Sequence, residues 1–519
     1  MNWVPIRGAL LIPLLIAACT PAAPASPAPV PSGPQYADQQ TLVLGFPNAP
    51  GTLDPHLLRS GGFRRFEMYE TLTLLSDGGR NLEPLLATEW KTTDPTTWRL
   101  TLRKDSKFHD GSALTAADVA FSWQRVQRPE LKSPVPGGMA SIADITAVDP
   151  QTIEIKTKAP DPILLRRLSQ LSVLPKAYLE RVGDAEFAAK PIGSGPFKLK
   201  DFKPDDRVVV TRWDEHPYRK PKLTEITIRA VPDAATRLTG LRTGELDMAM
   251  LLSVEAADTL KREGFQTLVA SQGIAGALFD AWGTDGSNGA ISDKRVRQAL
   301  NYAVDRETMA KTIYRGFAKP VGLHIKEGAF GFNPDIKPYT YDPKKAKELL
   351  AAAGYTNGLQ LQMDIWPGQS AENQPNGLFV QSQFKEIGVD LELVILDSTA
   401  FVDRIYKRKP QSPLLLGGLS TDPLADADAA LTWFWSSQPT FGKRLNNPEF
   451  DAAYVASRSE MDPKKREDLL KKAAAALQDD PGFLSLVDSI QITAFSKTVI
   501  GFSEPVDGWP VMDRIARIK

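Results

Sequence analysis

The sequence contains one cysteine, Cys19, and only four histidines in 519 residues. A single thiol excludes an internal disulfide and any zinc or iron–sulfur site built from several cysteines. The histidines stand far apart, with no HxH or HxxxH spacing that would place two imidazoles on one metal ion. The composition therefore argues against a structural metal site and predicts no cofactor.

Net charge is absent as well, because 62 basic side chains balance 62 acidic ones. A neutral chain has no long-range field that attracts nucleic acid or anionic lipid, so we expect no nucleic-acid partner. Apolar residues make up 42% and charged residues 24% of the chain, which is close to the averages for soluble globular proteins. At roughly 150 residues per domain, the length predicts about three folded units.

Only the start of the chain suggests a membrane-related segment. It runs from Arg7 through the apolar stretch 8–16 to Ala17, Ala18 and Cys19. This order is typical of a signal peptide, and the stretch is too short for a transmembrane helix, which needs about 20 residues. Residues 1–18 are therefore predicted to be a signal peptide.

The end of that segment, Ile16-Ala17-Ala18-Cys19, resembles the bacterial lipobox, in which the cysteine is acylated and becomes the first residue after cleavage. The alternative is an ordinary signal peptide with an incidental cysteine. Residues 20–34 are almost entirely proline, alanine and serine, a composition that favours an extended tether. We expect residues 19–35 to form a lipidated Cys19 and its tether, which attach the protein to a membrane in the cell envelope.

The rest of the chain alternates strand and helix patterns. Thr115 stands three residues before Asp118, close to a capping box, and predicts a helix over 116–126. Asp342-Pro343 and Asp462-Pro463 open two further helices, and Gly354 is suited to ending the first of them. Two more helices are predicted over 293–300 and 305–316, and strands over 41–44, 98–103, 152–157, 207–211, 223–230 and 391–395. This alternation predicts mixed α/β lobes.

Motifs for catalysis are scarce. The chain has no GxxxxGK[ST] loop, and Gly193-Ser194-Gly195 lacks the GxSxG spacing of a hydrolase nucleophile. His109 beside Asp110 is one half of a possible catalytic pair, although its surrounding sequence is typical of a turn. No enzymatic activity is predicted.

Two clusters have the chemistry for binding a ligand. The carboxylates of Asp422, Asp426 and Asp428 are suitable calcium ligands, but they lack the twelve-residue calcium-loop pattern. The aromatic run 433–435 has the rings to stack on a ligand, but neighbouring aromatics in an apolar run also serve as core residues. Each cluster therefore has a structural explanation beside the functional one.

Several motifs in order along the chain resemble the family 5 solute-binding proteins, the dipeptide and oligopeptide receptors of ABC importers. The resemblance starts with WRLTLRKDSKFHDGSALTAADVAFSWQRV at 98–126 and covers nearly all of residues 40–519. The other matching segments are PIGSGPF at 191–197, LTGLRTGELDM at 238–248, DKRVRQALNYAVD at 293–305, YDPKKAKELLAAAGY at 341–355 and NPEFD at 447–451.

The resemblance implies an α/β fold with two lobes, the Venus-flytrap arrangement of periplasmic binding proteins, with mixed sheets and a subdomain inserted in lobe one. By analogy, lobe one comprises 36–80, 190–280 and 490–519, the inserted subdomain 81–189, and lobe two 281–489. The implied function is the capture of a dipeptide or oligopeptide between the lobes, followed by delivery to an inner-membrane permease with its separate ATPase subunits. The protein is expected to be monomeric and periplasmic.

In the family's oligopeptide receptors, an aspartate in a Gly-Trp-x-x-Asp segment binds the α-amino group of the peptide. The matching stretch here is 418–422, so the resemblance implies that Asp422 binds the ligand, with Leu419 and Thr421 beside it. Trp433 of the aromatic run is a further candidate for ligand contact. An aspartate capping a turn before Pro423 is the structural alternative.

Two departures from the family pattern leave the ligand open. Leu419 stands where tryptophan is frequent, and Leu416 stands where some members have a basic residue that meets the ligand carboxylate. A receptor of the same fold for a nickel chelate, haem, glutathione or an oligosaccharide is therefore the first alternative. An envelope hydrolase that uses His109 is the second.

Overall fold

The computed structural model describes residues 35–58, 67–281, 289–367, 370–407, 412–420, 424–434, 437, 444–504 and 509–519. The predicted signal peptide, Cys19 and the tether up to residue 34 lie outside the described residues. Within the part of the chain that is described, no helix combines the length and apolar character needed to span a membrane.

Most strands belong to one large sheet. The described strands are β1 (Thr41–Phe46), β2 (Thr73–Ser76), β3 (Asn81–Pro84), β4 (Ala87–Asp94), β5 (Thr97–Leu102), β6 (Ile142–Asp149), β7 (Thr152–Thr157), β8 (Phe197–Lys203), β9 (Arg207–Arg212), β10 (Glu225–Ala230), β11 (Met248–Leu252), β12 (Gln266–Phe279), β13 (Leu359–Ile365), β14 (Val389–Ile395), β15 (Leu414–Ser420), β16 (Phe483–Phe495), β17 (Val499–Ile500) and β18 (Ala516–Arg517). The large sheet has ten strands in the order β14-β13-β15-β12-β16-β11-β1-β10-β9-β8.

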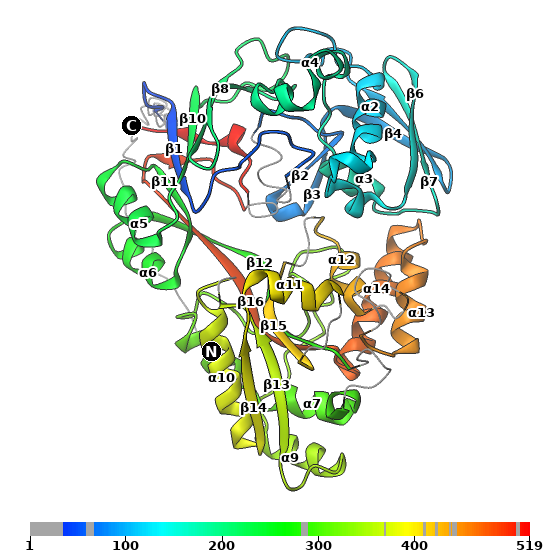
Figure 1. Ribbon diagram of the computed structural model, residues 1–519, viewed down its shortest axis with the longest axis vertical. Coiled ribbons are helices and arrows are strands. Elements are labelled where there is room, and N and C mark those ends of the chain that lie inside the picture. The colour runs from blue at the N-terminus through cyan, green and yellow to red at the C-terminus, as the bar shows by residue number, and fades with distance from the viewer. Residues whose placement is uncertain are drawn as a thin grey trace, which may run out of the picture.

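Helices cover this sheet and extend from its ends (Figure 1). The described helices are α2 (Ala116–Val126), α3 (Leu164–Arg167), α4 (Lys176–Ala189), α5 (Ala234–Thr243), α6 (Val254–Arg262), α7 (Lys294–Tyr302), α8 (Arg306–Thr312), α9 (Pro343–Ala352), α10 (Asn373–Glu386), α11 (Ser398–Lys407), α12 (Ala427–Leu431), α13 (Pro448–Ser457) and α14 (Pro463–Asp479).

The described residues form three large hydrophobic cores. Lobe one is the part packed around the buried residues Leu44, Ile226 and Trp509, whereas lobe two surrounds the largest core, which includes Leu350 and Phe384. The third core belongs to a four-stranded antiparallel sheet, β4-β5-β7-β6, covered by α2. We call this unit the small-sheet subdomain. The expected α/β architecture with mixed sheets is thus confirmed.

The two long strands β12 and β16 connect the lobes. In Figure 1 they run from the neighbourhood of β11 in the upper lobe down toward β13 and β15 in the lower lobe. They pair with each other in antiparallel fashion from Gln266 to Leu278. Because both strands contribute to both cores, any movement of one lobe against the other must bend or twist this ribbon.

The local helix signals were reliable. The capping box between Thr115 and Asp118 is present, and α2 spans the predicted residues. Asp342 caps α9 through the Lys345 amide, and Gly354 has the expected left-handed backbone with a φ of 95°. Asp462 caps α14 in the same way.

One helix is shorter than predicted. The pattern over 305–316 indicated a single helix, but α8 ends at Thr312. Arg315 and Gly316 both have positive φ values, 51° and 81°, which are incompatible with a continuing right-handed helix. The chain therefore turns four residues earlier than the apolar spacing suggested.

Candidate functional site

The connection between the lobes has an irregular centre. The register of β12 against β16 shifts between Ser271 and Gly273, and Gly273 has a φ of 147°. On β16, Asp488, Ser489 and Ile490 are half-buried, whereas the strand residues on both sides of them are buried. A bulge and a partly exposed stretch thus coincide where the strands pass from one lobe to the other, which places the most deformable part of the ribbon there.

The neighbouring strand β15 has an open edge at the same place. Its seven residues pair with β12, ending with Ser420 opposite Gly273. On its other side β15 pairs with β13 only as far as Leu416. Within the described part of the chain, no strand pairs with the outer edge of Gly417–Ser420. This stretch can therefore accept a further strand through its backbone amide and carbonyl groups.

The predicted binding residues are only partly described. Leu419 lies in β15 opposite Ile274, whereas Thr421 and Asp422 fall outside the described residues. Trp433 follows α12 in a short 3-10 helix and packs, half-buried, against the core of lobe two. Of these four residues, the structure therefore places Leu419 by its backbone and Trp433 by its packing.

Leu416, the second departure from the family pattern, is a core residue. Its side chain is 1% exposed within the core of lobe two. A basic side chain at this position would have to leave a dry environment or be paired within it. The leucine is consistent with its surroundings and leaves the protein without a cation at this point of β15.

Arg166 joins the small-sheet subdomain to lobe two. Its Nη1 atom donates to the carbonyl oxygens of Gly79 at 2.8 Å and Leu424 at 2.7 Å. The side chains of Leu75, Ile163 and Leu424 form a small hydrophobic cluster beside this contact. Figure 1 shows α3, which carries Arg166, immediately above α12. Polar and apolar contacts together hold the lobes close on this side.

Glu504 forms a second contact between the lobes. It accepts from Arg80 Nη2 at 2.5 Å and from Lys326 Nζ at 2.8 Å, so one carboxylate lies between two cations from different parts of the chain. Burial alone would raise the pKa of Glu504, but the hydrogen bonds and charges of Lys326 and Arg80 outweigh it and lower the pKa. The ionised carboxylate is therefore the form that this contact favours.

Two of the three aspartates with the chemistry of calcium ligands, Asp426 and Asp428, have other partners, and the third, Asp422, lies outside the described residues. Asp426 caps α12 and forms two 2.7 Å hydrogen bonds with Arg466. Asp428 accepts from the Tyr454 hydroxyl at 3.1 Å and lies 3.5 Å from Arg167. Among the residues described, no group of histidine, cysteine, aspartate and glutamate side chains is arranged to hold a metal ion. Asp426 and Asp428 thus act in the packing of α12 and α14.

His109 is held by backbone groups on both sides of its ring. Its Nε2 lies 2.9 Å from the Gly195 carbonyl oxygen, and the Gly193 amide donates to Nδ1 at 3.1 Å. Burial lowers the pKa of His109 to about 4. With both nitrogens engaged and the ring neutral, His109 fixes the 193–195 turn and lacks a free nitrogen for general-base catalysis.

The two glycines of that turn are needed for close packing. A Cβ atom on Gly193 would lie 1.9 Å from the main-chain oxygen of Met68, and one on Gly195 would lie 2.2 Å from that of Glu67. Backbone-to-backbone contact therefore explains why glycines stand at both positions of this turn.

Sequence reasoning missed the residues that bring the lobes together. Arg80, Arg166 and Glu504 lie in short connecting segments or a one-turn helix, and their partners are far away in the sequence. The open edge of β15 was also missed, because strand pairing between distant segments leaves no local pattern. The apolar run at 414–416 is the one local signal in the sequence that is typical of a buried strand at β15.

Comparison with known proteins places this geometry in a family. Residues 81–442 match the family model described as bacterial extracellular solute-binding proteins, family 5 Middle. The chain belongs to this family. Its members are the periplasmic substrate-binding components of ABC importers.

Individual relatives resemble this family 5 protein over most of its length. Heme-binding protein A of Haemophilus influenzae is 27% identical over 96% of both chains. Glutathione-binding protein GsiB of Salmonella paratyphi A is 29% identical over 79% of this chain and 81% of that protein. A solved structure of DppA from Helicobacter pylori, an ABC transporter-associated periplasmic binding protein in complex with the peptide STSA, is also similar. The two sequences are 26% identical, the TM-score is 0.76, and the match covers 93% of this chain and 99% of that chain. The expected two-lobed fold is confirmed.

Proposed function

We propose that this family 5 protein captures peptides between its lobes and delivers them to the permease of an ABC importer. The observation that carries the proposal is the open outer edge of β15 at Gly417–Ser420, beside the irregular centre of β12 and β16. An extended peptide added to this edge would pair through main-chain groups that all peptides share, so its sequence can vary.

The sequence around this edge supplies an anchor for the peptide. Ser420 ends β15 two residues before Asp422. We propose that Asp422 pairs with the α-amino group of the bound peptide, with Leu419, Thr421 and Trp433 near the ligand. A charge-assisted pair of this kind contributes roughly 1.5 to 3 kcal/mol, or about one to two decades in affinity. The peptide in the DppA complex supports this ligand class.

A second ligand class has a specific observation in its favour. The Haemophilus influenzae relative that matches nearly the whole chain is named for haem binding. This chain also lacks a cation at Leu416 and a tryptophan at Leu419, two side chains that suit short-peptide recognition in the family. The alternatives to a general peptide ligand are haem, a nickel chelate, glutathione and an oligosaccharide.

Titration calorimetry with a pool of short peptides tests the proposal. We expect heat of binding for the wild-type protein and affinity lower by roughly one to two decades in Asp422→Asn. Asp390→Asn is the matched control, because Asp390 is exposed near the start of β14, opposite Gln360, whereas the open stretch of β15 lies past the other end of β13, beyond Leu416. Equal affinity in both variants would show that Asp422 does not bind the peptide. If no peptide gave heat of binding, the assignment of peptides as the ligand would be wrong.

The remaining sequence predictions also stay proposals. We propose that the protein is a monomer anchored through acylated Cys19, and that its units are lobe one (36–80, 190–280 and 490–519), the insertion (81–189) and lobe two (281–489). Incorporation of labelled palmitate that disappears in Cys19→Ala tests the anchor. Retention of the label in that variant would contradict it.

A further inference from the structure

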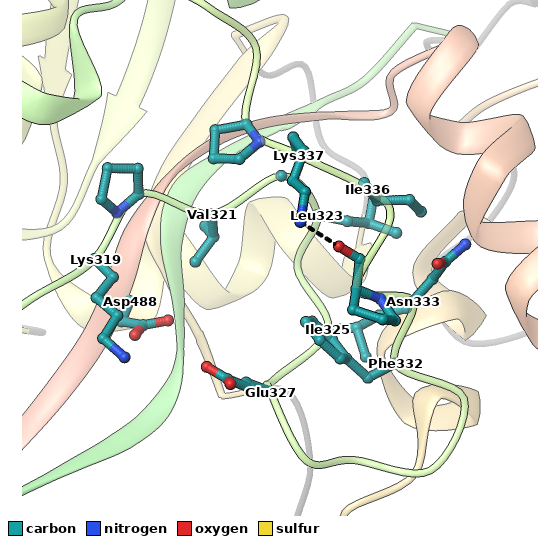
Figure 2. Close-up of a pocket in the computed structure, with 14 residues that line it drawn as sticks. Lys319, Val321, Leu323, Ile325, Glu327, Phe332, Asn333, Ile336, Lys337 and Asp488 are labelled. Atoms are coloured by element: carbon teal, nitrogen blue, oxygen red, sulfur yellow. Dashed lines mark hydrogen bonds between the residues drawn. The ribbon is translucent and has the colours of Figure 1, made fainter. Parts of the chain in front are cut away.

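The segment 319–338 folds against β16 and lines a pocket of about 270 Å³ (Figure 2). The Val321 amide donates to the Leu486 carbonyl at 3.2 Å, and the Asp488 amide donates to the Lys319 carbonyl at 3.0 Å. The segment then returns so closely that a Cβ atom on Gly322 would meet the Lys337 backbone at 2.7 Å. The backbone that carries the lining residues of this segment is therefore held in place by hydrogen bonds and close packing.

The lining of the pocket has two chemically different parts. Val321, Leu323, Ile325, Phe332 and Ile336 supply an apolar wall, and four of these five side chains are only half-buried. In Figure 2, Asp488, Lys319 and Glu327 lie on one side of the pocket, whereas Ile325, Phe332 and Ile336 lie on the other. A ligand that fits this lining needs one polar end and one apolar end.

Two lysines and two carboxylates line the pocket, and they differ in the partners that they have. Lys337 also lines the pocket, but its ammonium donates to the Pro334 carbonyl at 2.7 Å. Lys319 is the remaining cation, facing the two carboxylates of Glu327 and Asp488. The pocket is therefore balanced in formal charge, and a cationic ligand end is favoured where it reaches a carboxylate that no hydrogen bond or ion pair from the described residues yet occupies.

The Asp488 carboxylate is partly buried and lacks a bonded partner in the described part of the chain. Among the described residues, no hydrogen bond or ion pair reaches its side chain, although it is half-buried. Burial raises its pKa to about 6, Lys319 and Lys326 lower the pKa, and Glu327 raises it. An unpaired carboxylate in a partly desolvated position would gain from a donor that carries a positive charge.

We propose that this pocket binds a small amphipathic amine, whose ammonium group pairs with Asp488 and whose apolar part packs against Leu323, Ile325 and Phe332. The volume gives room for on the order of ten non-hydrogen atoms. The pocket is one strand removed from β15, because β12 lies between β15 and β16, with Ile274 paired to Leu419 on one side and to Asp488 on the other. Amine binding here does not depend on the proposed peptide function.

Calorimetry with hexylammonium, hexanol and hexanoate tests this site in the full-length protein. We expect hexylammonium to bind and the neutral and anionic analogues to bind at least about tenfold more weakly. Hexylammonium affinity falls by about the same factor in Asp488→Asn and is unchanged in Asp390→Asn. Hexanoate binding as tightly as hexylammonium, or no binding of hexylammonium at millimolar concentration, would overturn the proposal.

A second variant tests the apolar side of the pocket without a change of charge, and the pH dependence tests the charge of Asp488 without a substitution. Leu323→Trp fills the apolar side, so it is expected to abolish binding while Asp488 remains. Below about pH 6 Asp488 becomes protonated beside Lys319, Lys326 and Glu327, so hexylammonium affinity falls on acidification. Unchanged affinity in both variants would place the amine elsewhere. Peptide binding by Asp488→Asn, measured in parallel, separates failure of this site from failure of the peptide proposal.

Discussion

Arg166 donates from Nη1 to the main-chain oxygen of Leu424 at 2.7 Å, and this bond joins the small-sheet subdomain to lobe two. The same nitrogen also donates to Gly79 at 2.8 Å. A ligand held between the lobes stabilises the closed form only through contacts that differ between the open and closed forms. Contacts between the lobes, such as this one, stabilise the closed form and so reduce the binding energy that the ligand must supply for closure.

Replacement of Arg166 by alanine is expected to weaken closure. The loss of two hydrogen bonds from a charged donor costs about 1.5 to 3 kcal/mol, so ligand affinity should fall roughly tenfold or more. Small-angle scattering of the ligand-saturated protein should show a larger radius of gyration for Arg166→Ala than for the wild type. Arg181→Ala is the control, because Arg181 is exposed on α4 and stacks over Tyr178. Equal compactness of both variants would mean that Arg166 does not hold the lobes.

Acid should weaken the contact made by Glu504. Its pKa is lowered in the folded protein, so its contribution to stability is present above the pKa of the unfolded chain and is lost as pH falls through the folded pKa. Thermal unfolding between pH 7 and pH 3 should therefore show a steeper loss of stability for the wild type than for Glu504→Gln. At pH 7 we expect the variant to be less stable by about 1 kcal/mol. Parallel curves for the two proteins would contradict the assigned role.

His109 should lower the stability of the protein in a higher pH range than Glu504 does. Its pKa is lowered from 6.5 to about 4, so the neutral ring stabilises the fold fully above pH 6.5, and that stability is lost as pH falls toward 4. The shift corresponds to about 3 kcal/mol at most. His109→Gln should flatten the stability profile between pH 6.5 and 4. Loss of a hydrolytic activity in this variant would instead revive the hydrolase hypothesis.

The turn glycines provide a stability test with an internal control. Gly193→Ala would force a Cβ atom against the Met68 oxygen, and we expect a destabilisation of more than about 3 kcal/mol or failure to fold. Gly138→Ala is the control, since a Cβ atom there meets nothing within 4 Å. Its free energy of unfolding should change by less than about 0.5 kcal/mol. A tolerated Gly193→Ala would show that this turn packs less tightly than described.

Signals within a few residues predicted the helices. The pairing of strands that are far apart in the sequence could not be predicted in this way. Thr115 with Asp118 marks a helix start by chemistry that lies within four residues, and the same holds for Asp342 before Pro343. By contrast, β12 pairs with β16, more than two hundred residues later in the chain. No periodicity in either segment specifies its partner, so the ribbon between the lobes appeared only in the structure.

The candidate site divides in the same way. Family resemblance pointed to the region of Asp422, and the structure adds the open edge of β15 that leads into it. The search for catalytic motifs also drew attention to His109 and the Gly-Ser-Gly turn, which the structure explains as packing. The unpaired Asp488 had no sequence signal, because a carboxylate within an apolar strand looks the same whether or not it has a partner. Burial and neighbours decide its chemistry.

Mass spectrometry of the solute that co-purifies with the protein tests the central claim most directly. If the protein captures peptides between its lobes, material released by denaturation should contain short peptides of mixed sequence, and Asp422→Asn should retain less of it than Asp390→Asn. Recovery of haem, a metal chelate or an oligosaccharide in stoichiometric amount, without peptides, would contradict the peptide assignment.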